Sequence, residues 1–195
     1  DLGRGLVKVF QTPLDGLLML GGRAVSATQT LIGIEPPGRE LTGPERAELK
    51  KIFGDSIDLD RVRIKEGPAG LFSISKRAFV HGDTVYIPPN SAPPSMDLLV
   101  HELTHVWQHQ NGGIDYMSEA LWAQNFGDSY LFRKALLEGK RWSELNPEQQ
   151  ASFIASIRTL GLFDNPNARY MVGNQDFTDV AREAIAELRR GEGAP

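Results

Sequence analysis

The stretch from Ser95 to Gly112 reads SMDLLVHELTHVWQHQNG and predicts a long amphipathic helix. Two prolines precede this stretch, Ser95 is a good N-cap residue, and Gly112-Gly113 is a typical helix end. Apolar residues recur at the spacing of a buried helical stripe: Met96, Leu99, Val100, Leu103, Val106 and Trp107. We therefore expect this helix to be anchored in a core along one face.

The same helix carries the pattern H-E-x-x-H, formed by His101, Glu102 and His105. Residues four apart lie one above the other on a helix, so both imidazoles can point at one metal ion. The two histidines fall on the side opposite the apolar stripe, where they can face a cleft. Glu102 points in another direction and can act on a water held by the metal. The alternative, two core histidines satisfied by hydrogen bonds, is disfavoured by the combination of spacing, helix and glutamate.

A catalytic zinc usually has three protein ligands and one open position, so a third ligand is needed. If Gly112-Gly113 joins two antiparallel helices, His105 and Glu119 come to similar heights, which makes Glu119 the first candidate. Asp115 and Asp128 remain alternatives. The competing explanation for Glu119 is an acidic residue that stabilises the first turn of a helix through the helix dipole.

His109 is a weaker ligand candidate, because it lies about 12 Å along the helix axis from His101. A metzincin would place its third histidine where this chain has Asn111. Three residues could donate a hydrogen bond to the oxyanion of a hydrolytic reaction: His81, Tyr116 and Tyr130. An ordinary turn residue is the simpler interpretation of His81.

Elsewhere the sequence predicts a small sheet followed by helices, an α+β arrangement. Thr42 and Glu45 form a capping box for a helix that should end at Gly54, and residues 61–65 alternate as a strand. Gly82-Asp83 should turn a hairpin between residues 78–81 and 84–87, whose edge could bind an extended peptide. Further helices are expected at residues 118–137, from Asn146-Pro147 to Gly161, and from an N-cap at Thr178 to Gly191.

Composition excludes several classes of function. The 195 residues include no cysteine, which rules out disulfides, cysteine-zinc sites, iron–sulfur clusters and thiol catalysis. The formal net charge of -4 gives no electrostatic footprint for nucleic acid. Residues 16–34 are apolar-rich but too interrupted by polar residues and glycine to make a good membrane span.

Several motifs occur in one order and resemble a known family. They are Leu41–Arg46, Phe53-Gly54, Val62–Ile64, the hairpin of residues 78–87, and His101–Gln108, which reads HELTHVWQ. This order resembles the metallopeptidase domain of bacterial contractile-injection-system and toxin-associated proteins, including Vgr-related proteins. The resemblance covers about residues 41–125. In that family an acidic stretch follows the motif, whereas here Ser118–Ala120 has fewer acids, which leaves the third ligand open.

The resemblance implies a zincin-like, gluzincin-type site, with His101 and His105 as zinc ligands and Glu102 as the catalytic base. The pattern along the chain predicts a mostly helical, zincin-like α+β domain over residues 41–195, with a small sheet before the motif helix, preceded by an arm or linker at residues 1–40. That arm could pack on the domain, dock on a partner or cover the cleft. The resemblance does not explain the helices from about residue 126 onward.

The leading hypothesis is a Zn²⁺-dependent metalloendopeptidase, acting on a protein or peptide, in a bacterial secretion or toxin system. Its substrate could be its own precursor, or a protein of a host or rival cell. The alternative is a non-catalytic adaptor or structural component of an injection apparatus, with a structural or vestigial zinc site. Secretion-system partners are expected, without nucleic acid or a membrane span. The expected location is the bacterial cytoplasm or outside the cell after export through the injection system.

Overall fold

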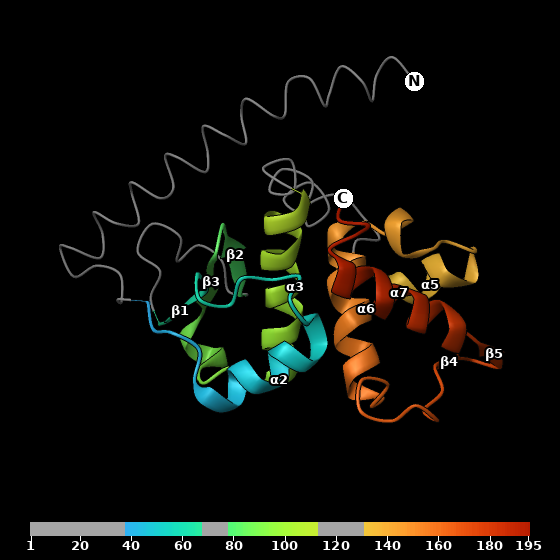
Figure 1. The fold of residues 1–195 in the computed structure, drawn as a ribbon, viewed down its shortest axis with the longest axis horizontal. Helices are drawn as coiled ribbons and strands as arrows, with labels where there is room; N and C mark the ends of the chain where they lie inside the picture. The colour runs from blue at the N-terminus through green and yellow to red at the C-terminus, as the bar shows by residue number, and fades with distance from the viewer. Residues whose placement is uncertain (1–37, 68–77, 113–130) are drawn as a thin grey trace, which may run out of the picture.

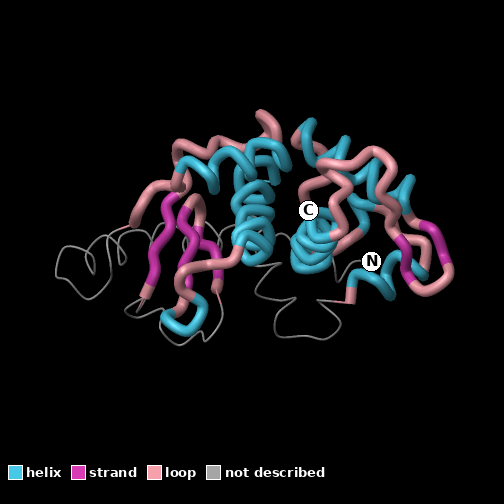
Figure 2. The backbone as a smooth tube through the Cα atoms, turned by 90° about the horizontal axis from the view of Figure 1, so that it is seen from below, coloured by secondary structure: helices cyan, strands magenta, loops and turns pink. Residues whose placement is uncertain are grey.

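The computed structural model describes residues 38–67, 78–112 and 131–195. A small sheet lies on one side of helix α3 (Met96–Gly112), and helix α6 (Pro147–Thr159) lies on its other side (Figure 1). The two views show α3 and α6 side by side, at the seam between a sheet-containing half and a helical half (Figures 1 and 2). The mostly helical α+β arrangement expected from the sequence is confirmed.

The first half begins with helix α2 (Gly43–Phe53), whose predicted capping box is present. The Thr42 side chain accepts a hydrogen bond from the backbone N–H of Glu45, and the Glu45 carboxylate accepts one from the Thr42 N–H. Gly54 ends the helix at a φ of 62°, a conformation that residues with a side chain rarely adopt. The helix therefore begins and ends where the local sequence predicts.

Three strands form a mixed sheet: β1 (Arg63–Glu66), β2 (Phe79–His81) and β3 (Thr84–Ile87). The central strand β3 pairs in parallel with β1 and antiparallel with β2. The predicted hairpin at Gly82-Asp83 is confirmed, and the strand predicted at residues 61–65 starts and ends slightly later. A short 3-10 helix, η2 (Pro89–Ser91), then leads toward α3.

Helix α3 spans nearly the predicted stretch, and its predicted apolar stripe packs into the core. Trp107 is fully buried, and its indole N–H donates to the Leu188 carbonyl oxygen at 3.0 Å, on helix α7 (Thr178–Arg190). The Trp107 ring also contacts the Trp142 ring, with centroids 5.7 Å apart. Trp107 therefore links α3 to the helical half of the molecule, while His101 and His105 lie elsewhere on the same helix.

The second half contains α6 and α7 together with shorter elements. These are α5 (Phe132–Leu137), the 3-10 helix η3 (Trp142–Glu144) and the antiparallel pair β4 (Met171–Val172) and β5 (Gln175–Asp176). The predicted helix at 118–137 coincides with α5 at its end, and residues 118–130 lie outside the described part of the chain.

The N-terminus of α7 corrects one prediction. Thr178 is the first helical residue, not the N-cap, which is Phe177. The Thr178 hydroxyl instead accepts a hydrogen bond from the Tyr170 N–H at 2.9 Å, and the Asp176 carboxylate accepts one from the Thr178 N–H. The Thr178 hydroxyl therefore joins α7 to the segment before β4, and the Asp176 carboxylate accepts the hydrogen bond of an N–H group in the first turn of α7.

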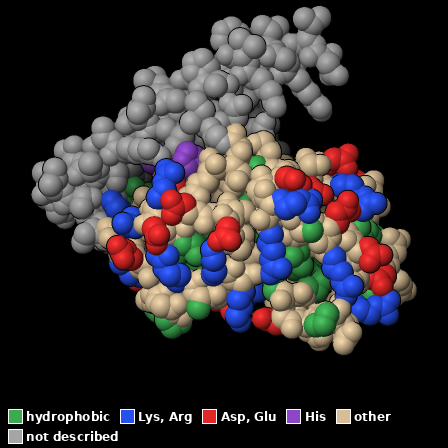
Figure 3. Space-filling view, in the orientation of Figure 1, with side chains coloured by type: hydrophobic (Ala, Val, Ile, Leu, Met, Phe, Trp, Pro, Cys, Tyr) green, Lys and Arg blue, Asp and Glu red, His purple; other side chains and the backbone are tan. Residues whose placement is uncertain are grey.

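Among the residues that the structure describes, no helix has both the length and the apolarity needed to cross a membrane. Lys, Arg, Asp and Glu side chains are interspersed over the face shown in Figure 3.

Candidate metal centre

Two histidines of α3 project toward α6. His101 and His105 lie one helical turn apart, with ring centroids at 5.1 Å and planes at 81°. The His105 side chain is buried, whereas that of His101 is 20% exposed. The i, i+4 spacing thus places both imidazoles on one side of α3, as the motif predicts.

A carboxylate from α6 meets the two histidines. Glu148 lies in the first turn of α6, after the N-cap Asn146, and its side chain is only 2% exposed. One Glu148 oxygen, Oε2, is 3.3 Å from Nε2 of His101, and the other, Oε1, is 3.5 Å from Nε2 of His105. A carboxylate buried this deeply is costly unless it is paired or binds a metal.

The three side chains fit the ligand set of a zinc ion. One ligand atom from each of His101, His105 and Glu148 can be chosen so that all three lie within 4.8 Å of one another. Ligand atoms bound about 2.0–2.1 Å from a tetrahedral zinc are about 3.3 Å apart, close to the observed nitrogen-to-oxygen distances. Two imidazoles with one carboxylate is also a donor set of catalytic zinc sites.

Glu102 lies next to this cluster in a desolvated position. Its side chain is buried, and burial raises the pKa of its carboxyl above the ordinary value. His101 and His105 lower that pKa and the negative charge of Glu148 raises it further, with a net upward shift. A carboxyl with a raised pKa is suited to exchange protons near neutral pH.

Glu148 and Gln108 both lie against the His105 ring. Burial alone would lower its pKa, but the hydrogen bond and charge of Glu148, the charge of Glu102 and a hydrogen bond with Gln108 together raise the pKa to about 8. The Nδ1 atom of His105 is 2.8 Å from Oε1 of Gln108. The Nε2 atom, which faces Glu148, is therefore the ring nitrogen available to a metal.

The sheet, α2 and α3 form the part of the chain with a recognisable family pattern. Residues 40–113 match the family model of the eCIS core domain, which is associated with contractile injection systems. This segment contains His101, Glu102 and His105, and it ends well before Glu148. Three of the four residues that gather at the site therefore lie in the segment that matches the eCIS core model, and the fourth, Glu148, comes from the helical half.

The chain is also similar to part of a bacterial secretion-system protein. The chain is 29% identical over 152 residues to the type VI secretion system spike protein VgrG2b of Pseudomonas aeruginosa. The similarity covers 71% of this chain but 15% of the spike protein, so the chain corresponds to a small part of that relative. No solved structure matches the chain significantly.

The structure describes only some of the other predicted site residues. Five of them lie outside the described residues: Asp115, Tyr116, Glu119, Asp128 and Tyr130. His81 is buried on β2, and His109 lies on α3 one turn beyond His105.

Sequence reasoning missed Glu148. The helix start at Asn146-Pro147 was predicted, but an acid in a first turn is usually explained by the helix dipole. Only the packing of α6 against α3 reveals that this acid faces the histidines.

Proposed function

We propose that this chain is a zinc-dependent metallopeptidase of gluzincin type. In this proposal His101, His105 and Glu148 hold the zinc, and Glu102 is the catalytic base. The observation that carries the proposal is the meeting of the three donor side chains at the seam of α3 and α6, beside a buried glutamate whose pKa is raised.

Each of these residues would have a separate role in peptide hydrolysis. A bound zinc would polarise the scissile carbonyl and make a water molecule more acidic. Glu102 would take the proton from the attacking water and deliver it to the leaving amine. His101 and His105 would leave their Nε2 lone pairs free for the metal, and the negative charge of Glu148 would favour binding of a cation. Burial of Glu102, His105 and Glu148 strengthens these electrostatic effects.

The biological context is inferred from the comparisons. The match to the eCIS core domain and the similarity to a type VI secretion spike protein support a role in a bacterial secretion or injection system. We infer that the substrate is a protein or peptide encountered during assembly or delivery.

The replacement Glu102→Gln tests the catalytic role. The variant should bind about one zinc per chain, like the wild type, because Glu102 is not a ligand in this proposal. Cleavage of a quenched fluorescent peptide library should fall by about 10²- to 10⁴-fold, the usual contribution of general base catalysis. Glu144→Gln changes an exposed carboxylate and is the matched control, with unchanged activity. Equal cleavage by wild type and Glu102→Gln would exclude Glu102 as the base.

A non-catalytic adaptor is the second candidate, and the coordination number separates it from an enzyme. Structural zinc sites are usually filled by four protein ligands, whereas a catalytic site keeps one open position. Among the residues that the structure describes, His101, His105 and Glu148 are three candidate ligands. If Glu119 were a fourth, the site would be closed and the adaptor function would be favoured.

Two replacements decide between Glu148 and Glu119. Glu148→Gln should weaken zinc binding by more than the about 10- to 100-fold typical of an outer-shell partner, while Glu119→Gln should leave it unchanged. Competition with a fluorescent chelator measures both affinities. Loss of affinity in Glu119→Gln alone would move the third ligand to Glu119. Loss in both variants would indicate a closed, structural site.

A further inference from the structure

The amide of Gln150 has only one possible orientation. Gln150 is completely buried on α6, and its Nε2 donates to the carbonyl oxygens of Trp142 at 2.9 Å and Gly193 at 2.7 Å. A backbone carbonyl oxygen can only accept a hydrogen bond. The NH₂ group must therefore face these two carbonyls, and Oε1 of Gln150 must point the other way.

The orientation of Gln150 fixes that of Gln108 on α3. Gln108 is also completely buried, and its Nε2 lies 2.9 Å from Oε1 of Gln150 and 3.0 Å from the Pro147 carbonyl oxygen. Both of these atoms are acceptors, so the two N–H groups of Gln108 are both used. Its Oε1 must then face the remaining neighbour, which is Nδ1 of His105 at 2.8 Å.

An amide oxygen cannot donate, so the His105 Nδ1 must carry a proton. We propose that Gln108 and Gln150 form a relay that holds His105 as the Nδ1–H tautomer and thereby presents its Nε2 lone pair to the metal. Three backbone carbonyls, of Trp142, Pro147 and Gly193, set the direction of this relay. The inference rests on the proposed metal site. Gln108 and Gln150 are positioning residues, because they act through His105.

The relay also sets the spacing of the site. Pro147 immediately precedes Glu148, and its carbonyl accepts from the same amide that holds His105. One buried side chain of α3 is thereby bonded both to a metal-binding histidine and to the turn that carries the metal-binding carboxylate. Loss of Gln108 should disturb the orientation of His105 and the distance between His105 and Glu148 together.

Zinc affinity provides the first test. Gln108→Met keeps a side chain of similar length that can no longer make these hydrogen bonds, and it should weaken zinc binding by about 10- to 100-fold. Gln150→Met should weaken it by about tenfold, although Gln150 does not touch the proposed ligands. Gln110→Met is the matched control, because Gln110 lies on α3 but bonds to Asp58 and Asp83. The relay would be overturned if Gln108→Met and Gln150→Met bound zinc as tightly as Gln110→Met does, whether or not all three variants bind more weakly than the wild type.

The tautomer of His105 provides a second test. It reports on the proposed relay directly, whereas a general loss of stability would not change which ring nitrogen carries the proton. In the zinc-loaded wild type with ¹⁵N-labelled histidine, NMR should show a slowly exchanging proton on Nδ1 of His105 and a metal-bound Nε2. In Gln108→Met, if it folds, this proton should exchange much faster. A proton on Nε2, or zinc bound through Nδ1, would overturn the proposal in the wild type alone, so the test does not depend on the folding of a variant.

The proposed relay and the proposed metal site can be tested separately. The same NMR measurement on the metal-free wild type, at a pH where the His105 ring is neutral, reports the tautomer without zinc or substrate. An Nδ1–H proton there, with no zinc uptake, would support the relay and contradict the proposed function. An Nε2–H proton would contradict the relay even if zinc binds.

Discussion

At the scale of single residues, two buried carboxylates stand out at the candidate metal centre. Glu102 and Glu148 are both buried, although a carboxylate is costly to bury without compensation. Glu148 faces two imidazoles, whereas Glu102 has a raised pKa. The different surroundings support different roles, with Glu148 as a ligand and Glu102 as a group that exchanges protons.

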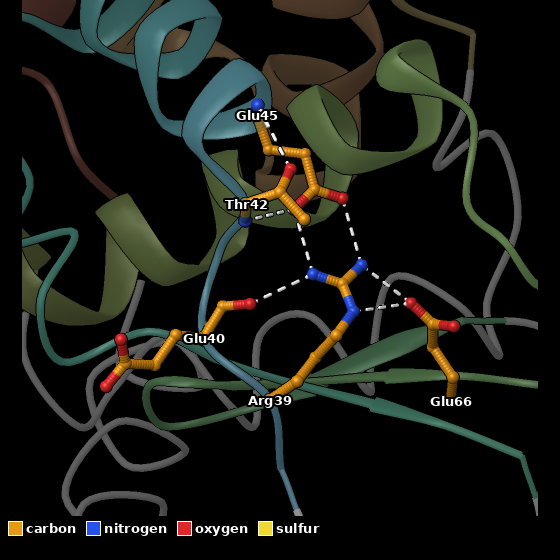
Figure 4. A network of polar contacts seen from close by, with 5 residues as sticks. All are labelled: Arg39, Glu40, Thr42, Glu45 and Glu66. Carbon is orange, nitrogen blue, oxygen red and sulfur yellow. Dashed lines mark hydrogen bonds and ion pairs between the residues drawn. The ribbon is translucent and has the colours of Figure 1, made fainter.

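A second polar network lies away from the candidate metal centre. The Arg39 guanidinium bonds to both oxygens of Glu45, at the start of α2, and to Glu66 on β1. Figure 4 shows the guanidinium between the two carboxylates, with Glu45 also accepting from the Thr42 N–H. Arg39 and Ile64 also exchange backbone hydrogen bonds. The segment before α2 is therefore fastened to the sheet.

This network predicts a dependence of stability on pH. Burial opposes ionisation of Glu45, but hydrogen bonds from Arg39 and Thr42 outweigh it and hold the pKa below its ordinary value. A lowered folded-state pKa stabilises the protein above the ordinary glutamate pKa of about 4.3, and this stabilisation is lost as pH falls through the folded-state pKa. Glu45→Gln should therefore lower the free energy of unfolding by about 1–2 kcal/mol at pH 7, and by less in acid.

Urea unfolding at pH 7 and in acid measures this effect. Glu40→Gln is the matched control, because Glu40 pairs with Arg63 at 3.6 Å through a side chain that is 73% exposed. An exposed ion pair contributes little, so this variant should resemble the wild type at both pH values. A loss in Glu45→Gln that is equally large in acid would contradict the role of the Glu45 charge.

At the scale of elements, helix ends follow from local sequence. Thr42 with Glu45, and Asn146 with Gln149, form reciprocal capping boxes at the starts of α2 and α6. Each box joins residues three apart, so the pattern can be recognised without knowledge of the fold. Thr178 shows the limit of such reasoning, because its hydroxyl accepts a hydrogen bond from the N–H of Tyr170, which lies eight residues earlier, just before β4.

Strand pairing depends less on local sequence. The hairpin of β2 and β3 could be predicted because a Gly-Asp turn joins the strands directly. The parallel pairing of β1 with β3 joins residues that are distant in sequence, such as Ile64 and Val85. Both residues are fully buried, so the shared core selects this register.

At the scale of the whole molecule, the candidate metal centre joins the two halves. His101 and His105 come from α3 and Glu148 comes from α6, so a bound ion would add a crosslink between these helices. A ligand that binds only the folded state stabilises it by about 2.7 kcal/mol at a hundred times its Kd. Zinc at that excess should raise the thermal unfolding midpoint of the wild type by several degrees.

Calorimetry with zinc and with a chelator measures this stabilisation. His105→Ala removes one proposed ligand, so its unfolding midpoint should be independent of zinc. The control variant Thr104→Val changes a buried neighbour whose hydroxyl donates to the Val100 carbonyl on the same helix, and it should keep the zinc response. A zinc response of equal size in His105→Ala would place the binding of zinc elsewhere in the chain.

The sequence by itself determined the motif helix, its buried stripe, the two histidines and the glutamate between them, because all of these depend on helical periodicity over a few residues. It also determined the capping box of α2 and the hairpin of β2 and β3. Only the tertiary structure decided that Glu148 lies beside the two histidines and that Gln108 contacts both His105 and Gln150. These contacts join α3 to α6, and no local pattern specifies which faces of two helices distant in sequence will pack together.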